Sequence, residues 1–208
     1  MYRKDKKHEY YTIKARKEGY PARSVYKLKD IDEKFHFFKK EDVVLDLGAS
    51  PGSWILYISE KIGDKGRVFG VDIQDIKINL PQNAVFVKKS ILEIENDGFL
   101  NKKYNSVVAD LSPNTTGIKS IDAGVSLELS EKAFEIAKKV LAKNGSFVCK
   151  IFQGEGMDDF LKEISSHFKI FKRYKPKAVI KNSKEFYIVA KGFLGQEQKR
   201  EKRDKEEK

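Results

Sequence analysis

Four charged residues occupy unusual positions beside short apolar runs. Lys150 lies inside one such run, Asp110 ends another and Glu185 begins a third, whereas Lys27 lies in a basic helical segment. A buried lysine is costly to charge and gives up its proton readily, so Lys150 is a candidate proton acceptor. Each residue also has an ordinary alternative role. Lys150 can snorkel to the strand end, and Asp110 can be a turn residue. Glu185 can be a solvated residue at the sheet edge, and Lys27 can be a solvated lysine on a helix.

A segment with two glycines predicts a ligand site. Residues 46–54 (DLGASPGSW) follow an apolar run, and glycines there let the backbone turn sharply into a helix and approach a ligand closely. The spacing of Gly48 and Gly52 fits neither the dinucleotide pattern Gly-x-Gly-x-x-Gly nor a phosphate-binding P-loop, and the turn contains no lysine. The alternative is a plain turn between a strand and a helix.

An acid at the end of the next strand strengthens the ligand interpretation. Asp72 closes the second apolar run, where a carboxylate can accept hydrogen bonds from ribose hydroxyls. Trp54 falls in the first turn of the following helix, near the expected ligand, although core packing is the usual role of a lone tryptophan. The turn and the acid together indicate a nucleoside-containing cofactor that needs no pyrophosphate.

The apolar pattern predicts the elements that position these residues. Short β-branched runs end at turn signals and alternate with helical periodicity, which predicts an α/β fold: a mostly parallel sheet with helices on both faces. Seven strands are expected, at residues 43–47, 67–72, 84–87, 106–110, 146–152, 169–174 and 185–193. A long helix is expected at about 122–142, terminated by Gly145. No long helix separates the last two strands, so we expect one of them to be antiparallel at the end of the sheet.

Length and composition predict one domain. The chain has 208 residues, of which 40% are hydrophobic, enough for a single globular core. We expect one domain over residues 1–194, in which residues 1–40 form a basic N-terminal segment. Residues 195–208 are charged and almost free of apolar side chains, so this tail is expected to be disordered. Cys149 alternates to the strand face opposite Lys150, so we expect it in the core.

The charge favours a polyanionic partner, with nucleic acid as the first candidate. The net charge is +11, and residues 1–40 contribute 13 Lys and Arg against 6 Asp and Glu. The tyrosines of the first 20 residues can stack on exposed bases or pack in the core. A compositional bias toward lysine is the alternative reason for the charge.

The remaining composition narrows the class of protein. No apolar run approaches the roughly 18 residues of a spanning helix, and the N-terminus is polar, so we expect no membrane segment and no secretion signal. One cysteine and three scattered histidines offer neither a disulfide nor a metal-binding spacing. A reducing, cytoplasmic location is therefore expected.

Five segments, in order over residues 20–193, resemble the FtsJ/RrmJ family of RNA ribose 2′-O-methyltransferases. They are ARSVYKL (22–28), DLGASPGSW (46–54), ADLSPN (109–114), KIFQG (150–154) and SKEFY (183–187). They are similar to the family's Ser-Arg-Ala-x-x-Lys-Leu segment, its cofactor turn, and its Asp-x-x-Pro, Lys-x-Phe-x-Gly and Ser-x-Glu-x-Tyr segments. The resemblance implies a Rossmann-like S-adenosyl-L-methionine-dependent methyltransferase fold.

The resemblance also implies residue roles. It implies a catalytic tetrad of two lysines and two acids, with Lys150 as the proton acceptor: Lys27, Asp110, Lys150 and Glu185. It implies contacts of S-adenosyl-L-methionine with Gly52, Trp54, Asp72 and Asp110. In water only about one lysine in 2,500 is neutral at pH 7. Burial and the charge of Lys27 favour the neutral form of Lys150, while the two acids hold the ammonium groups in place.

The substrate implied by the resemblance is RNA, with a uridine of 23S (large-subunit) ribosomal RNA favoured. Transfer RNA is the alternative, and a non-catalytic RNA-binding protein on the same scaffold is the alternative from another class. An NAD-dependent oxidoreductase is disfavoured by the glycine spacing. Two departures from the family pattern stand out: Ser90 replaces an aspartate that contacts adenine in many members, and Ser53 replaces the glycine usual in bacterial members.

Overall fold

The fold is described from a computed structural model of the whole chain, over residues 6–94, 98–113, 116–180 and 183–195. The predicted tail, 195–208, lies outside these residues apart from Gly195. Within the described chain, no helix is both long enough and apolar enough to cross a membrane.

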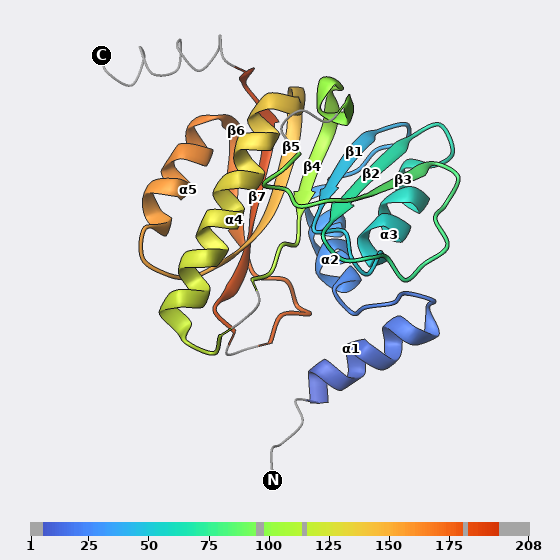
Figure 1. Ribbon diagram of the computed structural model, residues 1–208, viewed down its shortest axis with the longest axis horizontal. Helices are drawn as coiled ribbons and strands as arrows, with labels where there is room; N and C mark the ends of the chain where they lie inside the picture. The colour runs from blue at the N-terminus through green and yellow to red at the C-terminus, as the bar shows by residue number, and fades with distance from the viewer. Residues whose placement is uncertain (1–5, 95–97, 114–115, 181–182, 196–208) are drawn as a thin grey trace.

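A seven-stranded sheet forms the centre of the molecule, in the order β3-β2-β1-β4-β5-β7-β6 (Figure 1). The strands are β1 (Val43–Leu47), β2 (Arg67–Asp72), β3 (Ala84–Lys88), β4 (Tyr104–Ala109), β5 (Leu141–Phe152), β6 (Phe168–Tyr174) and β7 (Glu185–Phe193). The helices are α1 (Lys6–Lys17), α2 (Val25–Phe35), α3 (Ser53–Ile62), α4 (Lys119–Val140) and α5 (Met157–Ser166), with a short 3₁₀ helix η1 at Gly98–Asn101. The predicted α/β class with a mostly parallel, seven-stranded sheet is confirmed.

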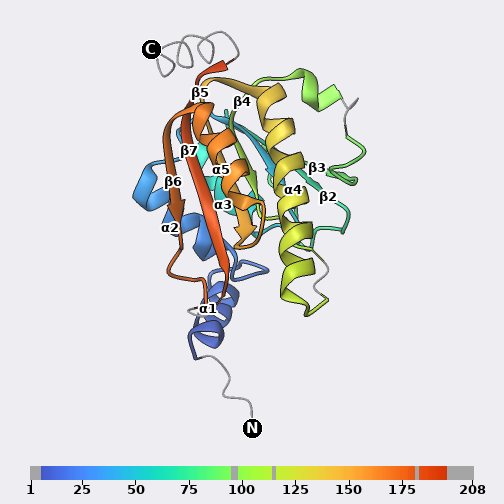
Figure 2. The same cartoon turned by 90° about the vertical axis from the view of Figure 1, so that its left-hand side faces the viewer.

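Helices cover both faces of the sheet and make three layers (Figure 2). Because successive strand residues point to opposite faces, each strand contributes to two separate cores. In β5, Val148 packs with α2 and α3, whereas Phe147 and Cys149 pack with α4 and α5. Cys149 is therefore a core residue, as predicted, and burial raises the pKa of its thiol to about 12, so it is protonated at neutral pH.

The antiparallel strand is β7, but it lies one place in from the edge. It pairs with β5 on one side and β6 on the other, both antiparallel, so β6 forms the edge of the sheet. The prediction that the antiparallel strand ends the sheet is therefore wrong in position. The pairing has a functional consequence, because it brings the first residues of β7 beside the last residues of β5.

The long helix is displaced from its predicted range. Helix α4 runs from Lys119 to Val140 and stops earlier than the apolar pattern indicated. Leu141 already belongs to β5, where it pairs with Tyr104 of β4 before the register shifts. The strand pairing therefore ends the helix before Gly145, which we expected to terminate it.

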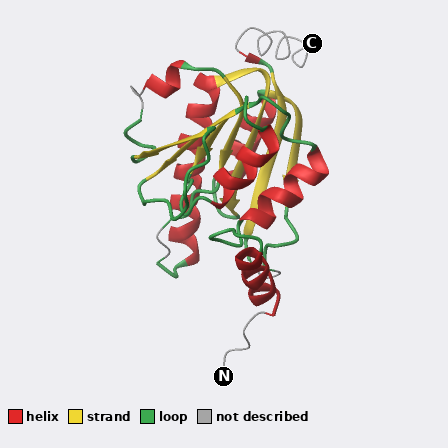
Figure 3. Cartoon of the chain, turned by 90° about the vertical axis from the view of Figure 1, so that its right-hand side faces the viewer, coloured by secondary structure: helices red, strands yellow, loops and turns green. Residues whose placement is uncertain are grey.

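Helix α1 lies at the end of the sheet where the parallel strands finish (Figures 1 and 3). Its buried side consists of small and aromatic residues, with Ala15 1% exposed and the Tyr11 ring 5.1 Å from that of Tyr26 in α2. The basic N-terminal segment is therefore partly a helix packed on the domain.

Candidate active site

The turn after β1 is built from two glycines with positive φ. Gly48 has φ +84°, and a Cβ there would lie 3.1 Å from the backbone nitrogen of Leu111. Gly52 has φ +107°, and a Cβ there would lie 2.7 Å from Ile78. Both positions therefore require glycine, because an L side chain would be strained and would collide.

Asp72 at the end of β2 holds this turn in place. Its Oδ2 accepts a hydrogen bond from the backbone N–H of Ser50 at 2.9 Å, and its Oδ1 accepts one from Gln74 at 2.8 Å. A carboxylate can accept about four hydrogen bonds, so Asp72 keeps acceptor capacity for a ligand. The residue that the sequence singled out for ribose binding thus also organises the backbone around the site.

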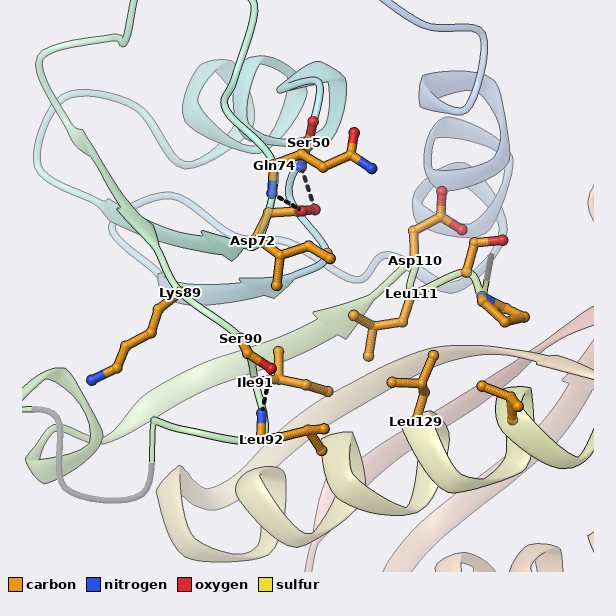
Figure 4. A pocket seen from close by; sticks show the side chains of 15 residues that line it. Ser50, Asp72, Gln74, Lys89, Ser90, Ile91, Leu92, Asp110, Leu111 and Leu129 are labelled. Atoms are coloured by element: carbon orange, nitrogen blue, oxygen red, sulfur yellow. Dashed lines mark hydrogen bonds between the residues drawn. The ribbon is translucent and has the colours of Figure 1, made fainter. Parts of the chain in front are cut away.

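A pocket of about 370 Å³ opens at the carboxyl ends of the strands (Figure 4). Asp72 and Asp110 both line it; because β1 lies between β2 and β4, these two acids flank the glycine turn. Apolar side chains form much of the remaining wall: Ile73, Ile91, Leu92, Leu111, Val125 and Leu129. Ser90 also lines the pocket, and its hydroxyl accepts a hydrogen bond from Leu92 N–H.

The pocket is where ligands bind in sheets of this kind, beyond the carboxyl ends of parallel strands. Of the four expected cofactor contacts, Asp72 and Asp110 line it, whereas Gly52 and Trp54 are absent from the lining. Trp54 is 3% exposed, and its indole Nε1 donates to the carbonyl oxygen of Ser24. In this structure Trp54 therefore ties α3 to the segment that precedes α2.

The four charged residues singled out in the sequence come together as two ion pairs. Lys27 Nζ lies 2.6 Å from Glu185 Oε1, and Lys150 Nζ lies 3.3 Å from Asp110 Oδ1. Lys150 also donates to the Asp110 carbonyl oxygen at 3.0 Å. Both lysines are nearly buried, at 9% and 5% exposed. Snorkelling into water, the ordinary alternative for Lys150, does not describe a side chain so fully buried.

Tyr187 connects the two ion pairs, and the sequence had assigned it no role. Its hydroxyl donates to Asp110 Oδ1 at 2.6 Å, and Lys27 Nζ lies 5.8 Å from its ring centre. Tyr187 is the antiparallel partner of Lys150, because β5 and β7 are paired there. Sequence reasoning could have found this role. A buried carboxylate such as that of Asp110 needs hydrogen-bond donors, and Tyr187, two residues after Glu185, was an available donor.

The charges in this cluster keep Asp110 ionised. Burial by itself raises the pKa of the Asp110 carboxyl, but Lys150, Lys27 and the Tyr187 hydroxyl together outweigh it and hold the pKa below its usual value. Burial and the negative charge of Asp110 raise the pKa of Tyr187, so its hydroxyl stays a donor. The cluster therefore holds two lysine side chains and two acidic side chains in fixed positions beside the pocket.

Asp46, in β1 just before the glycine turn, has a different environment. It is fully buried, and neither of its oxygens accepts a hydrogen bond from the described residues. Burial raises the pKa of the Asp46 carboxyl well above its usual value, and the charges of Asp110 and Asp72 add to the effect. Asp46 is thus held toward its protonated form.

The Asp46→Asn variant should differ from the wild type in how stability depends on pH. An unfolded aspartate loses its proton near pH 4, whereas the folded protein retains the proton at Asp46 to higher pH. The folded state then binds more protons, so the wild-type free energy of unfolding falls as pH rises above about 4. Asparagine removes this contribution. Urea unfolding at pH 5 and pH 8 checks the prediction, and parallel pH profiles for the two proteins would contradict it.

Metal binding has no geometric support in the part of the chain that the structure describes. There, no three or more His, Cys, Asp and Glu side chains gather closely enough to hold an ion.

Solved structures define the class of protein. A ribosomal RNA methyltransferase from Plasmodium falciparum superposes with a TM-score of 0.75 at 26% identity, covering 85% of this chain and 100% of that one. A chain of a fibrillarin/Nop5p complex superposes with a TM-score of 0.57 at 17% identity, covering 81% and 83%, a likeness of fold. The fold and the pocket beyond its strands define a Rossmann-like methyltransferase.

The chain belongs to the FtsJ-like methyltransferase family, whose model matches residues 20–193. Two relatives are each called ribosomal RNA large subunit methyltransferase E. The one from Desulfatibacillum aliphaticivorans is 42% identical over 183 residues, covering 87% of this chain and 88% of its own. The one from Lawsonia intracellularis is 45% identical over 190 residues, covering 89% and 94%. The resemblance read from the five sequence segments is confirmed.

Proposed function

We propose that this protein transfers a methyl group from S-adenosyl-L-methionine to a ribose 2′-hydroxyl of large-subunit ribosomal RNA, at a uridine. One observation carries the chemistry: the Lys27–Glu185 and Lys150–Asp110 ion pairs lie together, and Asp110 also lines the pocket. The relatives support the substrate, because both are called ribosomal RNA large subunit methyltransferases. The alignments with this chain cover 88% and 94% of their lengths. We propose residues 1–194 as one functional domain.

The pocket residues suit S-adenosyl-L-methionine. Asp72 has free lone pairs for the ribose hydroxyls, and the apolar walls suit a flat base. Asp72, Asp110 and Lys89 all line the pocket, so it offers side chains of both charges to a ligand that carries positive and negative groups. The cofactor, when bound, supplies a methyl group on a positively charged sulfur.

Lys150 is the proposed proton acceptor for the 2′-hydroxyl. A ribose hydroxyl is a weak nucleophile until its proton begins to leave, so a positioned base is required. Lys150 comes from a rigid central strand and is fixed by two contacts to Asp110. Asp110 thereby both lines the cofactor pocket and holds the base. It can therefore align the methyl donor with the hydroxyl that receives the methyl group.

Lys27 and Glu185 complete the proposed tetrad from two other elements. Lys27 comes from α2, and Glu185 is the first residue of β7. Their side chains form an ion pair, with Lys27 Nζ 2.6 Å from Glu185 Oε1. We assign Lys27 to supplying positive charge that helps to keep Asp110 ionised, and Glu185 to fixing Lys27.

Comparison of total RNA from cells with and without the gene tests the proposed substrate. Mapping of 2′-O-methyl groups should show one uridine of the large-subunit RNA that loses its methyl group when the gene is deleted. A change confined to transfer RNA would favour the alternative substrate. No change in any ribose methylation would favour the non-catalytic RNA-binding alternative.

Asp72→Ala should weaken S-adenosyl-L-methionine binding about ten- to a hundredfold. The substitution removes an acceptor for the ribose hydroxyls, worth roughly 1–3 kcal/mol when the donor is left unpaired. It also frees the N–H groups of Ser50 and Gln74. Asp75→Ala is the matched control, because Asp75 lies in the same loop outside the pocket lining and pairs with Lys88. Calorimetry measures both variants, and equal affinity in a folded Asp72→Ala protein would remove Asp72 from the site.

A further inference from the structure

Helix α1 has an outward side that combines apolar and basic residues. Tyr10, Ile13 and Lys17 follow one another at helical spacing of three and four residues, so their side chains lie along one line of the helix surface. Tyr10 is 58% exposed and Ile13 is 46% exposed. Arg16 lies beside them, and it too is exposed. We call these four residues the α1 stripe.

Three contacts fix the position of this stripe on the domain. The Tyr11 ring packs 5.1 Å from Tyr26 of α2, and Glu18 just beyond α1 pairs with Lys29 of α2 at 2.9 Å. Lys7 donates to the carbonyl oxygen of Val179, in the loop that leads to Glu185. Helix α1 is therefore held at the active-site end of the sheet, next to the helix that carries Lys27 (Figures 1 and 3).

Tyr10 differs from the other tyrosines of this region. Tyr20 and Tyr26 are buried, and Lys29 Nζ lies over both rings, at 4.4 and 5.3 Å from their centres. Among the residues that the structure describes, the Tyr10 ring makes one ring contact, edge-to-face with Tyr11 at 5.3 Å and 72°. An aromatic ring left exposed on a packed helix is available to a partner, whereas the other rings already serve the core.

We propose that the α1 stripe is a stacking site for an unpaired base of the RNA substrate, with Tyr10 as the stacking ring. Exposed aromatics beside cations are the elements with which proteins bind single-stranded nucleic acid: the ring takes the base and the cations take the phosphates. Arg16 and Lys17 supply the cations. The proposal rests on the proposed RNA substrate and names the part of the surface that receives RNA outside the catalytic cluster.

RNA binding by full-length Tyr10 variants tests the stacking role. The probes are two labelled single-stranded RNAs of equal length, one with normal bases and one with abasic nucleotides, so that both carry the same phosphates. Tyr10→Ala should weaken binding of the normal RNA about five- to hundredfold and leave binding of the abasic RNA within twofold. Tyr10→Trp should restore the loss, because tryptophan keeps a stacking ring. Ile170→Ala is the matched control, since Ile170 is 50% exposed on β6.

The dependence of RNA affinity on salt distinguishes the contribution of the Tyr10 ring from that of the Arg16 and Lys17 charges. Arg16→Ala with Lys17→Ala should weaken both RNAs and flatten the dependence of affinity on salt, whereas Tyr10→Ala should leave that slope unchanged. Equal losses on both RNAs, no loss, or the same loss for Ile170→Ala would overturn the proposal. The proposal would also be overturned if Tyr10→Ala weakened binding to anionic vesicles and left binding to RNA unchanged. These measurements need no methyl transfer, so they fail or succeed independently of the proposed reaction.

Discussion

Lys150→Ala should slow methyl transfer about 100- to 10,000-fold while cofactor affinity stays within a few-fold. Removing a positioned general base typically has this effect, about 3–5 kcal/mol of barrier. Lys150 contacts Asp110 from the side of the tetrad and is absent from the pocket lining, so the cofactor site stays intact. Single-turnover methylation of RNA measures the rate, and calorimetry measures cofactor binding.

Two further variants make the Lys150 result specific. Lys150→Arg should not restore the rate, because a guanidinium stays protonated in this range. Lys162→Ala is the control, since Lys162 is exposed on α5, pairs with Asp159 and belongs neither to the tetrad nor to the pocket lining. Thermal denaturation must show that Lys150→Ala is folded. If the folded variant methylates RNA within tenfold of wild type, Lys150 is not the base.

Asp110→Asn should weaken cofactor binding and also slow methyl transfer by about 100-fold or more. Asp110 lines the pocket, pairs with Lys150 and accepts a hydrogen bond from Tyr187. The neutral amide removes the carboxylate that holds Lys150 in place. Breaking a buried ion pair on one side costs about 3–5 kcal/mol of stability. Melting temperature should therefore fall as well.

Tyr187→Phe is the graded comparison for Asp110. It keeps the ring beside Lys27 and Trp54 and removes only the hydroxyl that donates to Asp110. We expect a smaller loss of rate than for Asp110→Asn, with cofactor affinity close to wild type. If Asp110→Asn leaves both cofactor affinity and the rate of methyl transfer within tenfold of wild type, Asp110 neither contacts the cofactor nor positions Lys150.

The sequence predicted those features that depend on local pattern. The period-two alternation in β5 placed Lys150 and Cys149 on opposite faces, and the structure agrees. The glycine turn and the acid ending β2 were recognisable because a sharp strand-to-helix turn restricts the residue types allowed. Lys150, Asp110 and Glu185 were recognisable because charge beside apolar strands is costly without partners. Lys27 lies in a basic helical segment, and only the family resemblance singled it out.

Other features depend on packing between distant segments and left no local signal. The pocket wall joins Leu92, after β3, to Leu129 in α4, and no periodicity relates the two. Trp54 was expected near the ligand, but its indole nitrogen bonds to Ser24, a contact that only the tertiary fold can define. The end of α4 was set by strand pairing at Leu141 in place of Gly145. In each case tertiary contacts outweighed local propensity.

The position of the transferred methyl group on the RNA tests the proposed reaction. The purified protein is incubated with methyl-labelled S-adenosyl-L-methionine and large-subunit ribosomal RNA from cells lacking the gene, and the RNA is digested to nucleosides for mass spectrometry. We expect label in 2′-O-methyluridine alone, and none when the target uridine is replaced by 2′-deoxyuridine. Label on a base, or transfer that persists to the 2′-deoxy RNA, would contradict it.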